Sequence, residues 1–97
     1  SEHVNVPKWF DNGTHVFHLF VVRTKIRQRL MDALKLEGIE TMIHYPIAPH
    51  EQKAFSKKAF GHYPITEKLH REVVSLPIGI HVSEADAEFI CETLNKI

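Results

Sequence analysis

The sequence predicts a small α/β (α+β) domain in which a three-stranded antiparallel or mixed sheet packs against helices. Segments rich in β-branched and aromatic residues alternate with segments whose apolar residues recur at helical spacing, and Gly or Pro separates many of them. The length of 97 residues suffices for one domain with one modest core. The expected order of elements is β-α-β-(α-α)-β-α.

The first half of the chain predicts a strand, a helix and a second strand. Residues 15–22 (HVFHLFVV) have the composition of an interior strand. Thr24 is expected to cap a helix that runs to about Glu37. The apolar positions of this helix are Ile26, Leu30, Ala33 and Leu34. Residues 39–45 (IETMIHY) read as the second strand, which Pro46 ends.

The second half predicts two short helices and the third strand. Pro49 suits the first turn of a helix over roughly 50–59. Thr66 is expected to cap another helix over 67–72, and residues 73–76 (VVSL) form the third strand.

Ser83 is expected to begin the last helix, because Glu84 and Asp86 in its first turn suit the helix dipole. Its buried stripe is predicted to be Ile90, Leu94 and Ile97, with Phe89 beside them. Cys91 is expected to be a small buried hydrophobe, since it has no partner for a disulfide or a CxxC motif.

The beginning of the chain predicts a domain boundary. Residues 1–13 are polar, contain Pro7 and end in the turn signal Asn12-Gly13, so we expect an extended lead-in followed by one domain over 14–97.

Composition excludes several classes of protein. The formal net charge is zero and the charges are mixed in sign, which is unlike a nucleic-acid binder. No apolar run approaches the roughly 20 residues that a membrane-spanning helix needs, and no signal peptide precedes the domain. We therefore expect no nucleic acid, no membrane and a cytoplasmic location.

The eight histidines do not predict a metal site. In a strand, His15 and His18 would point to opposite faces, and no helix carries HxxxH. Nucleophile-elbow, Walker A and GxGxxG motifs are also missing, so no catalytic residue is predicted.

The segment IHYPIAPHEQ (43–52) is the candidate functional loop. It groups His44, Tyr45, His50 and Gln52 around two prolines at a strand end. Such side chains donate and accept hydrogen bonds, which suits a sugar or the diphosphate of a nucleotide. The alternative is that His44 and Tyr45 pack between sheet and helix while the prolines turn a corner.

Three blocks in order, HVFHLFVVR, GIETMIHYPIAPHEQKAF and PITEKLHREVVSLPI, resemble the C-terminal portion of the DegT/DnrJ/StrS sugar aminotransferases. The resemblance covers nearly the whole chain. Within this family, the sequence of these blocks is similar to that of enzymes that aminate a dTDP-linked 3-keto-6-deoxyhexose. The fold implied is the C-terminal small domain of the aspartate-aminotransferase fold.

That resemblance implies a longer parent, a pyridoxal-phosphate (PLP)-dependent homodimer that transfers an amino group from glutamate to a nucleotide-linked keto-sugar, with a dTDP-sugar as the expected substrate. Such enzymes serve the biosynthesis of lipopolysaccharide, S-layer or antibiotic sugars. A large domain would supply the Schiff-base lysine and hold the PLP, so the chain alone is expected to bind no cofactor and to be inactive. Carried over to this sequence, His44 and Tyr45, with His50 nearby, would bind the substrate.

Two other readings stay open at this point. The chain could be a free-standing, non-catalytic module that binds nucleotide sugars, or a histidine-rich metal binder. If a large domain normally covers this chain, the chain alone should expose apolar surface around Trp9, Phe10 and residues 44–46 (the HYP loop).

Overall fold

The computed structural model describes residues 1–8, 13–55 and 60–97. Its centre is an antiparallel pair of strands, β1 (Phe20–Arg23) and β2 (Val73–Leu76), with Phe20 opposite Leu76 and Arg23 opposite Val73. The predicted third strand of the sequence, 73–76, is therefore confirmed as β2.

The predicted three-stranded sheet is wrong, because the described residues form a sheet of only two strands. Segment 39–45 reaches β2 through one bridge, in which the Met42 amide donates to the Ser75 carbonyl (3.2 Å) and the Ser75 amide donates to the Met42 carbonyl (2.7 Å). The pairing stops there for a physical reason. On one side Pro77 has no N–H to donate, and on the other the Val73 carbonyl accepts from the Arg27 guanidinium.

β1 is shorter than the strand predicted over 15–22. The pairing of the two strands ends at Phe20 and Leu76, and Pro77 follows β2 directly. On the other edge of β1, Asn5 and Arg23 exchange two backbone hydrogen bonds of 2.9 Å. The segment that precedes the domain in the sequence prediction thus lies along β1.

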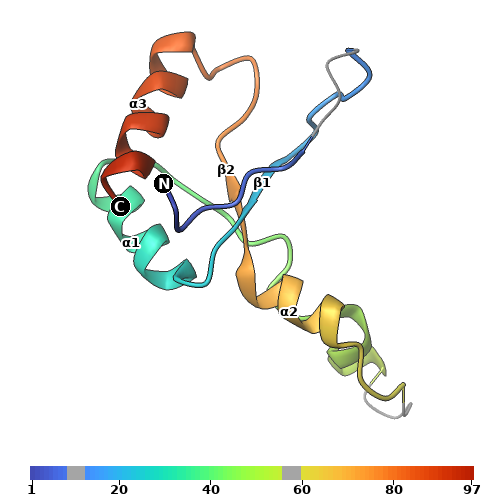
Figure 1. Cartoon of the computed structure of the whole chain (residues 1–97). Coiled ribbons are helices and arrows are strands. Elements are labelled where there is room, and N and C mark those ends of the chain that lie inside the picture. Colours follow the sequence, from blue (N-terminus) through green and yellow to red (C-terminus); the bar gives the residue numbers. More distant parts are fainter. Residues whose placement is uncertain (9–12, 56–59) are drawn as a thin grey trace.

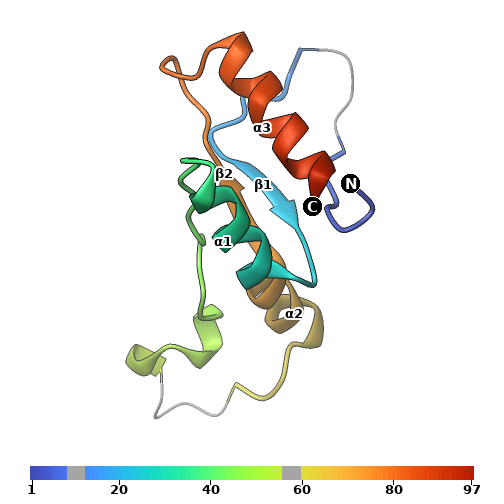
Figure 2. The ribbon, with the colours of Figure 1, turned by 90° about the vertical axis from the view of Figure 1, so that its left-hand side faces the viewer.

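Two helices, α1 (Arg27–Leu36) and α3 (Glu84–Lys96), lie on the same side of the strand pair (Figures 1 and 2). They bury one apolar cluster against the sheet, whose members are Val22, Leu30, Leu34, Ile39, Val74, Leu76, Ile90 and Leu94. The predicted stripes of both helices contribute to it, with Ile97 packed at its margin. Figure 2 also shows the two ends of the chain close together, where the Ser1 ammonium donates to Asn95 Oδ1 at 2.9 Å.

Gly38 ends α1, as the sequence predicts. Its φ of +77° is a left-handed conformation that favours glycine. The amides of Gly38 and Ile39 donate to the carbonyls of Lys35 (3.0 Å) and Leu34 (2.9 Å), which is the Schellman pattern. The chain is thereby turned into segment 39–45, beside β2.

α3 begins as predicted, with a capping box at Ser83. The Asp86 amide donates to Ser83 Oγ at 3.0 Å, and the Ser83 amide donates to Asp86 Oδ2 at 2.9 Å. The expectation for Cys91 is wrong, because this residue lies on the exposed side of the helix.

α2 (Pro64–Glu72) starts earlier than the predicted 67–72, because Pro64 occupies the first helical turn and Tyr63 the cap position. In place of the predicted helix over 50–59, the described part holds two 3₁₀ turns, η1 (Pro49–Glu51) and η2 (Lys53–Phe55), and residues 56–59 lie outside the described residues.

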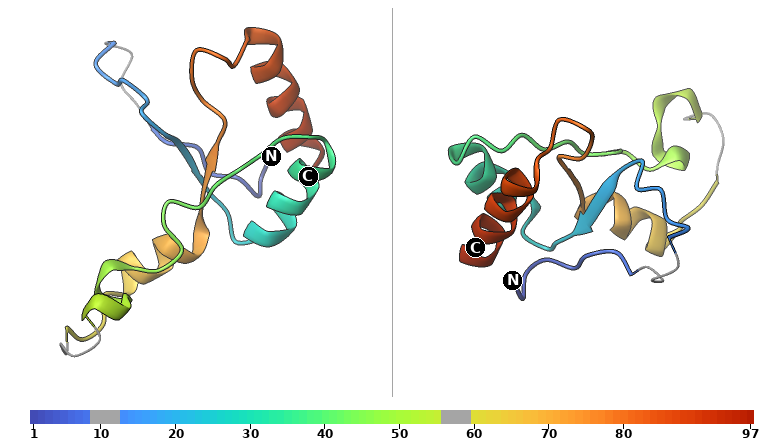
Figure 3. Two further views of the ribbon diagram at one scale, coloured as in Figure 1. Left: turned by 180° about the vertical axis from the view of Figure 1, so that it is seen from behind. Right: turned by 90° about the horizontal axis from the view of Figure 1, so that it is seen from above.

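α2 and the two 3₁₀ turns form an arm that extends away from the strand pair (Figures 1 and 3). The radius of gyration is 15.4 Å, against about 13 Å for a compact domain of similar length. The arm is fastened at its base, where the Glu72 carboxylate pairs with Arg23 at 2.9 Å and the Glu72 carbonyl accepts from the Thr24 amide at 2.9 Å.

Candidate functional site

Each residue that the sequence singles out in the 44–50 loop is held by the segment that contains α2 and β2. The contacts come from three positions along one continuous stretch of chain, two on the helix and one on the strand. The pairs are His44 with Ser75, the Tyr45 carbonyl with His70, and His50 with Glu67. Two of the three sequence blocks that carry the family resemblance therefore contact each other directly.

His44 lies at the end of segment 39–45 and is partly buried. Its Nδ1 lies 2.7 Å from Ser75 Oγ, and Ser75 is 6% exposed. His44 lines a hollow of about 370 Å³ beside β2. The lining residues are His18, Leu19, Glu40, Thr41, Met42, His44, Ser75, Leu76, Pro77 and Ile78.

Tyr45 projects to the surface and is 63% exposed. Its ring meets the His44 ring edge-to-face with a centroid distance of 5.4 Å, and its backbone carbonyl accepts a hydrogen bond from His70 Nδ1. The phenol is thus free to meet a ligand while the backbone beneath it is fixed. The alternative in which Tyr45 packs between sheet and helix is excluded.

His50 points in a different direction, toward α2. Its Nε2 lies 3.1 Å from Glu67 Oε1, its side chain is only 11% exposed, and its ring packs edge-to-face on Tyr63 at 4.8 Å. The ring nitrogen left for a ligand is Nδ1. His50 thus anchors the loop to α2.

Glu67 is the acceptor at the centre of this anchor. The hydrogen bond from His50 lowers the pKa of the Glu67 carboxyl, burial acts in the opposite direction, and His62, with Nδ1 at 3.5 Å, lowers the pKa further. The sequence predicts no functional role for Glu67. Its role in holding the loop requires the fold to bring residues 50 and 67 together.

The same anchor contains the one group of potential metal ligands found among the described residues. Nitrogen or oxygen atoms of His50, Glu51 and Glu67 lie within 4.8 Å of one another. Residues 50 and 67 belong to different segments, so their spacing in the sequence does not predict this group. The direct His50–Glu67 hydrogen bond accounts for this arrangement without an ion.

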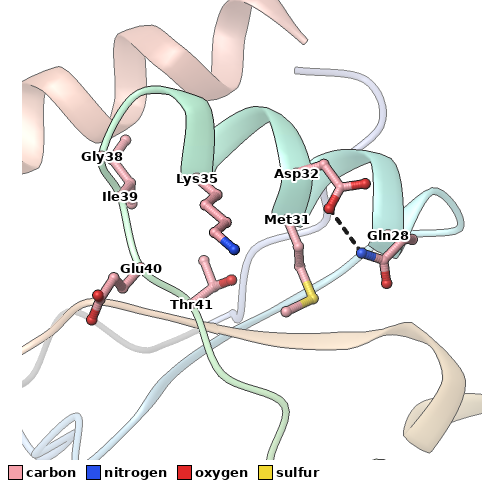
Figure 4. A pocket seen from close by; sticks show the side chains of 8 residues that line it. All are labelled: Gln28, Met31, Asp32, Lys35, Gly38, Ile39, Glu40 and Thr41. Atoms are coloured by element: carbon pink, nitrogen blue, oxygen red, sulfur yellow. Dashed lines mark hydrogen bonds between the residues drawn. The ribbon is translucent and has the colours of Figure 1, made fainter.

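A second hollow, of about 470 Å³, lies between α1 and the chain that follows it (Figure 4). Five of its eight lining residues are polar or charged, and Gln28 donates to Asp32 Oδ1 at 2.9 Å along the helix. None of the three predicted substrate residues lines it.

The described residues offer no fit for PLP chemistry. A PLP enzyme needs a lysine whose amine is held against the cofactor carbonyl. The lysines of the described residues are all exposed and none lines the His44 hollow: Lys8, Lys25, Lys35, Lys53, Lys68 and Lys96. No step of such a reaction is assigned to this chain.

The fold, together with the loop over 43–52 that α2 and β2 hold, defines a mixed α/β domain of the kind found in aminotransferase structures. The DegT/DnrJ/EryC1/StrS aminotransferase family model matches residues 2–95, and the chain belongs to this family.

Two of its curated relatives are named as dTDP-amino-sugar transaminases. The chain is 44% identical over 93 residues to dTDP-3-amino-3,6-dideoxy-alpha-D-galactopyranose transaminase of Aneurinibacillus thermoaerophilus, covering 96% of this chain and 26% of the relative. It is 42% identical over 95 residues to dTDP-3-amino-3,4,6-trideoxy-alpha-D-glucose transaminase of Streptomyces venezuelae, covering 96% and 25%.

Solved structures agree with the fold. DesV of S. venezuelae superposes with a TM-score of 0.88 at 33% identity, over 97% of this chain and 26% of that one. NtdA from Bacillus subtilis, a structure with bound cofactor PMP, gives a TM-score of 0.83 at 28% identity, over 97% and 22%. The chain thus spans about a quarter of the length of the proteins it matches. No helix among the described residues is long and apolar enough to cross a membrane.

Proposed function

We propose that this chain is the C-terminal small domain of a PLP-dependent enzyme that transfers an amino group from glutamate to a nucleotide-linked keto-sugar, with residues 1–13 leading into a domain over 14–97. The observation that carries the proposal is the likeness to sugar aminotransferases along almost the entire chain, at 44% identity in one relative. The dTDP-linked sugar is the favoured substrate, because two of the relatives are named for dTDP-amino-sugars.

In this proposal a cytoplasmic, homodimeric parent carries the large domain that binds PLP. The cofactor, when bound there, supplies the electron sink of amino transfer. The present chain binds and orients the sugar nucleotide through His44 and Tyr45, and His50 contributes through the loop it anchors.

The experiment compares the chain alone with the chain joined to the large domain of its parent. We expect the chain alone to show no PLP absorbance and no transaminase turnover, and the joined protein to show both. Covalent binding of PLP by the chain alone would contradict the proposal.

The site residues are tested in the joined protein by His44→Ala and Tyr45→Phe. Each variant loses one hydrogen bond to the substrate, which should raise KM for the nucleotide sugar by roughly 3- to 10-fold. Leu36→Ala, a change at an exposed position of α1, is the matched control. Equal KM values in all four proteins would remove His44 and Tyr45 from the site.

A further inference from the structure

We propose that Ser75 is a positioning residue: its hydroxyl donates to His44 Nδ1, so that the neutral ring carries its proton on Nε2 and offers that N–H to an acceptor oxygen of the nucleotide sugar. The identity of the ligand rests on the proposed function. The tautomer rests on the geometry of this chain alone.

The direction of the hydrogen bond follows from the surroundings of the Ser75 hydroxyl. Among the described residues, this hydroxyl has no side-chain or backbone partner other than His44 Nδ1, at 2.7 Å. Ser75 is 6% exposed, so its hydroxyl meets little water outside the hollow that it lines together with His44. If the ring donated to Ser75, water in that hollow would be the acceptor left for the hydroxyl proton, whereas a hydroxyl that donates to Nδ1 is paired within the fold. The hydroxyl therefore donates, and Nδ1 accepts.

The Ser75 backbone is fixed, which makes its hydroxyl a rigid reference point. Ser75 lies within β2 opposite Val21, and on the other edge it exchanges two backbone hydrogen bonds with Met42. Met42 is two residues before His44, so the same bridge positions the backbone of the histidine. The ring is held by both its backbone and its Nδ1 atom.

With Nδ1 occupied, Nε2 is the polar atom of the His44 ring that can reach a ligand. His44 and His18 both line the 370 Å³ hollow. A neutral Nε2–H group donates, so the ligand atom it meets is an acceptor, such as an oxygen of a diphosphate or of a sugar.

The tautomer is tested on the 97-residue chain by long-range ¹H–¹⁵N correlation NMR at about pH 8, where histidine is ordinarily neutral. We expect His44 Nδ1 to be unprotonated and Nε2 protonated. In Ser75→Ala the Nδ1–H form should reappear as a minor species, and in Ser75→Thr it should be absent again. A protonated Nδ1 in the unmodified chain would overturn the inference and leave the proposed function intact.

The ligand is tested in the joined enzyme with dTDP and with dTDP-glucose as probes. Ser75→Ala should weaken substrate binding by roughly 3- to 10-fold in KM with kcat nearly unchanged, and Ser75→Thr should restore it. Ser83→Ala is the matched control, because it removes a serine hydroxyl that does not line the hollow. If Ser75→Ala and Ser83→Ala changed kcat and KM to the same extent, the cause would be general destabilisation, and the positioning role of Ser75 would be overturned.

The two probes distinguish the acceptor oxygens. A shift of the His44 Nε2 resonance with dTDP itself assigns the acceptor to the diphosphate, and a shift only with dTDP-glucose assigns it to the sugar. A His44 resonance unmoved by both probes, in an enzyme that still turns over, would overturn the ligand half of the inference while the transaminase function stood.

Discussion

Glu67 accepts from His50 and contacts His62, and this local arrangement makes the anchor of the loop sensitive to acid. The hydrogen bond from His50 lowers the pKa of Glu67 below its ordinary value of 4.5, so the ionised form is favoured in the folded chain. A carboxyl with a lowered pKa stabilises the fold above its unfolded pKa. That contribution is lost as the pH falls through the folded pKa.

We therefore expect Glu67→Gln to lower the free energy of unfolding at about pH 7, and the difference from the unmodified chain to shrink below about pH 4.5. Urea unfolding at several pH values measures this. Glu51→Gln is the control, because its carboxylate lies 4.0 Å from His50 Nε2 and is 52% exposed. A Glu67→Gln difference that stayed constant with pH would contradict the account.

At the residue scale, the sequence identified the loop but not what holds it. His44 and Tyr45 stand out because imidazole and phenol groups sit beside prolines at the end of an extended segment. Ser75, His70 and Glu67 carry no such signal, because a serine in a strand and polar residues on a helix are ordinary. Only the antiparallel return of β2 beside segment 39–45 brings them to the loop.

At the scale of the elements, α1 depends on two fully buried leucines. Leu30 has no exposed surface, and neither has Leu34, one turn later. Leu30→Ala should cost about 2–5 kcal/mol in unfolding free energy, because the cavity it leaves adds to the lost transfer energy. Urea unfolding of the chain checks this. Leu36→Ala, on the same helix at 88% exposure, should change stability by less than about 0.5 kcal/mol, and equal losses would show that α1 is not packed as described.

α3 depends on its cap as well as on its buried face. Ser83→Ala removes the oxygen that accepts from the Asp86 amide, which should cost about 1 kcal/mol. Ser83→Thr keeps an acceptor and should retain most of that stability. Thermal unfolding of the three proteins measures the difference, and a Ser83→Thr variant as unstable as Ser83→Ala would argue against the capping box.

The element predictions succeeded where local chemistry decides and failed where pairing decides. Capping at Ser83 and the stop at Gly38 depend on a few neighbouring residues, and both were found from the sequence. The predicted second strand, 39–45, required a partner with free N–H and C=O groups along its length. Pro77 and the Arg27 side chain remove those groups, and neither effect is visible in the composition of residues 39–45.

At the scale of the whole molecule, the chain leaves much of its apolar surface uncovered. Ile80 is 97% exposed, Val16 88% and Ile65 78%. An apolar groove of about 380 Å³ runs between β2 and α3, lined by residues that include Phe20, Ile78 and Cys91. The expected exposure of the HYP loop is confirmed at Tyr45, whereas Trp9 and Phe10 lie outside the described residues.

Exposed apolar surface of this extent favours association, because burying it removes it from water. We expect the chain alone to self-associate as its concentration rises, and sedimentation velocity should show a concentration-dependent increase in mean mass. Ile78→Glu places a charge in the groove and should reduce the association. Glu84→Gln changes the charge at an exposed position of α3 outside the groove and should not reduce it. A chain that stayed monomeric at every concentration would mean that this surface needs no cover, and would weaken the proposal that a large domain packs against it.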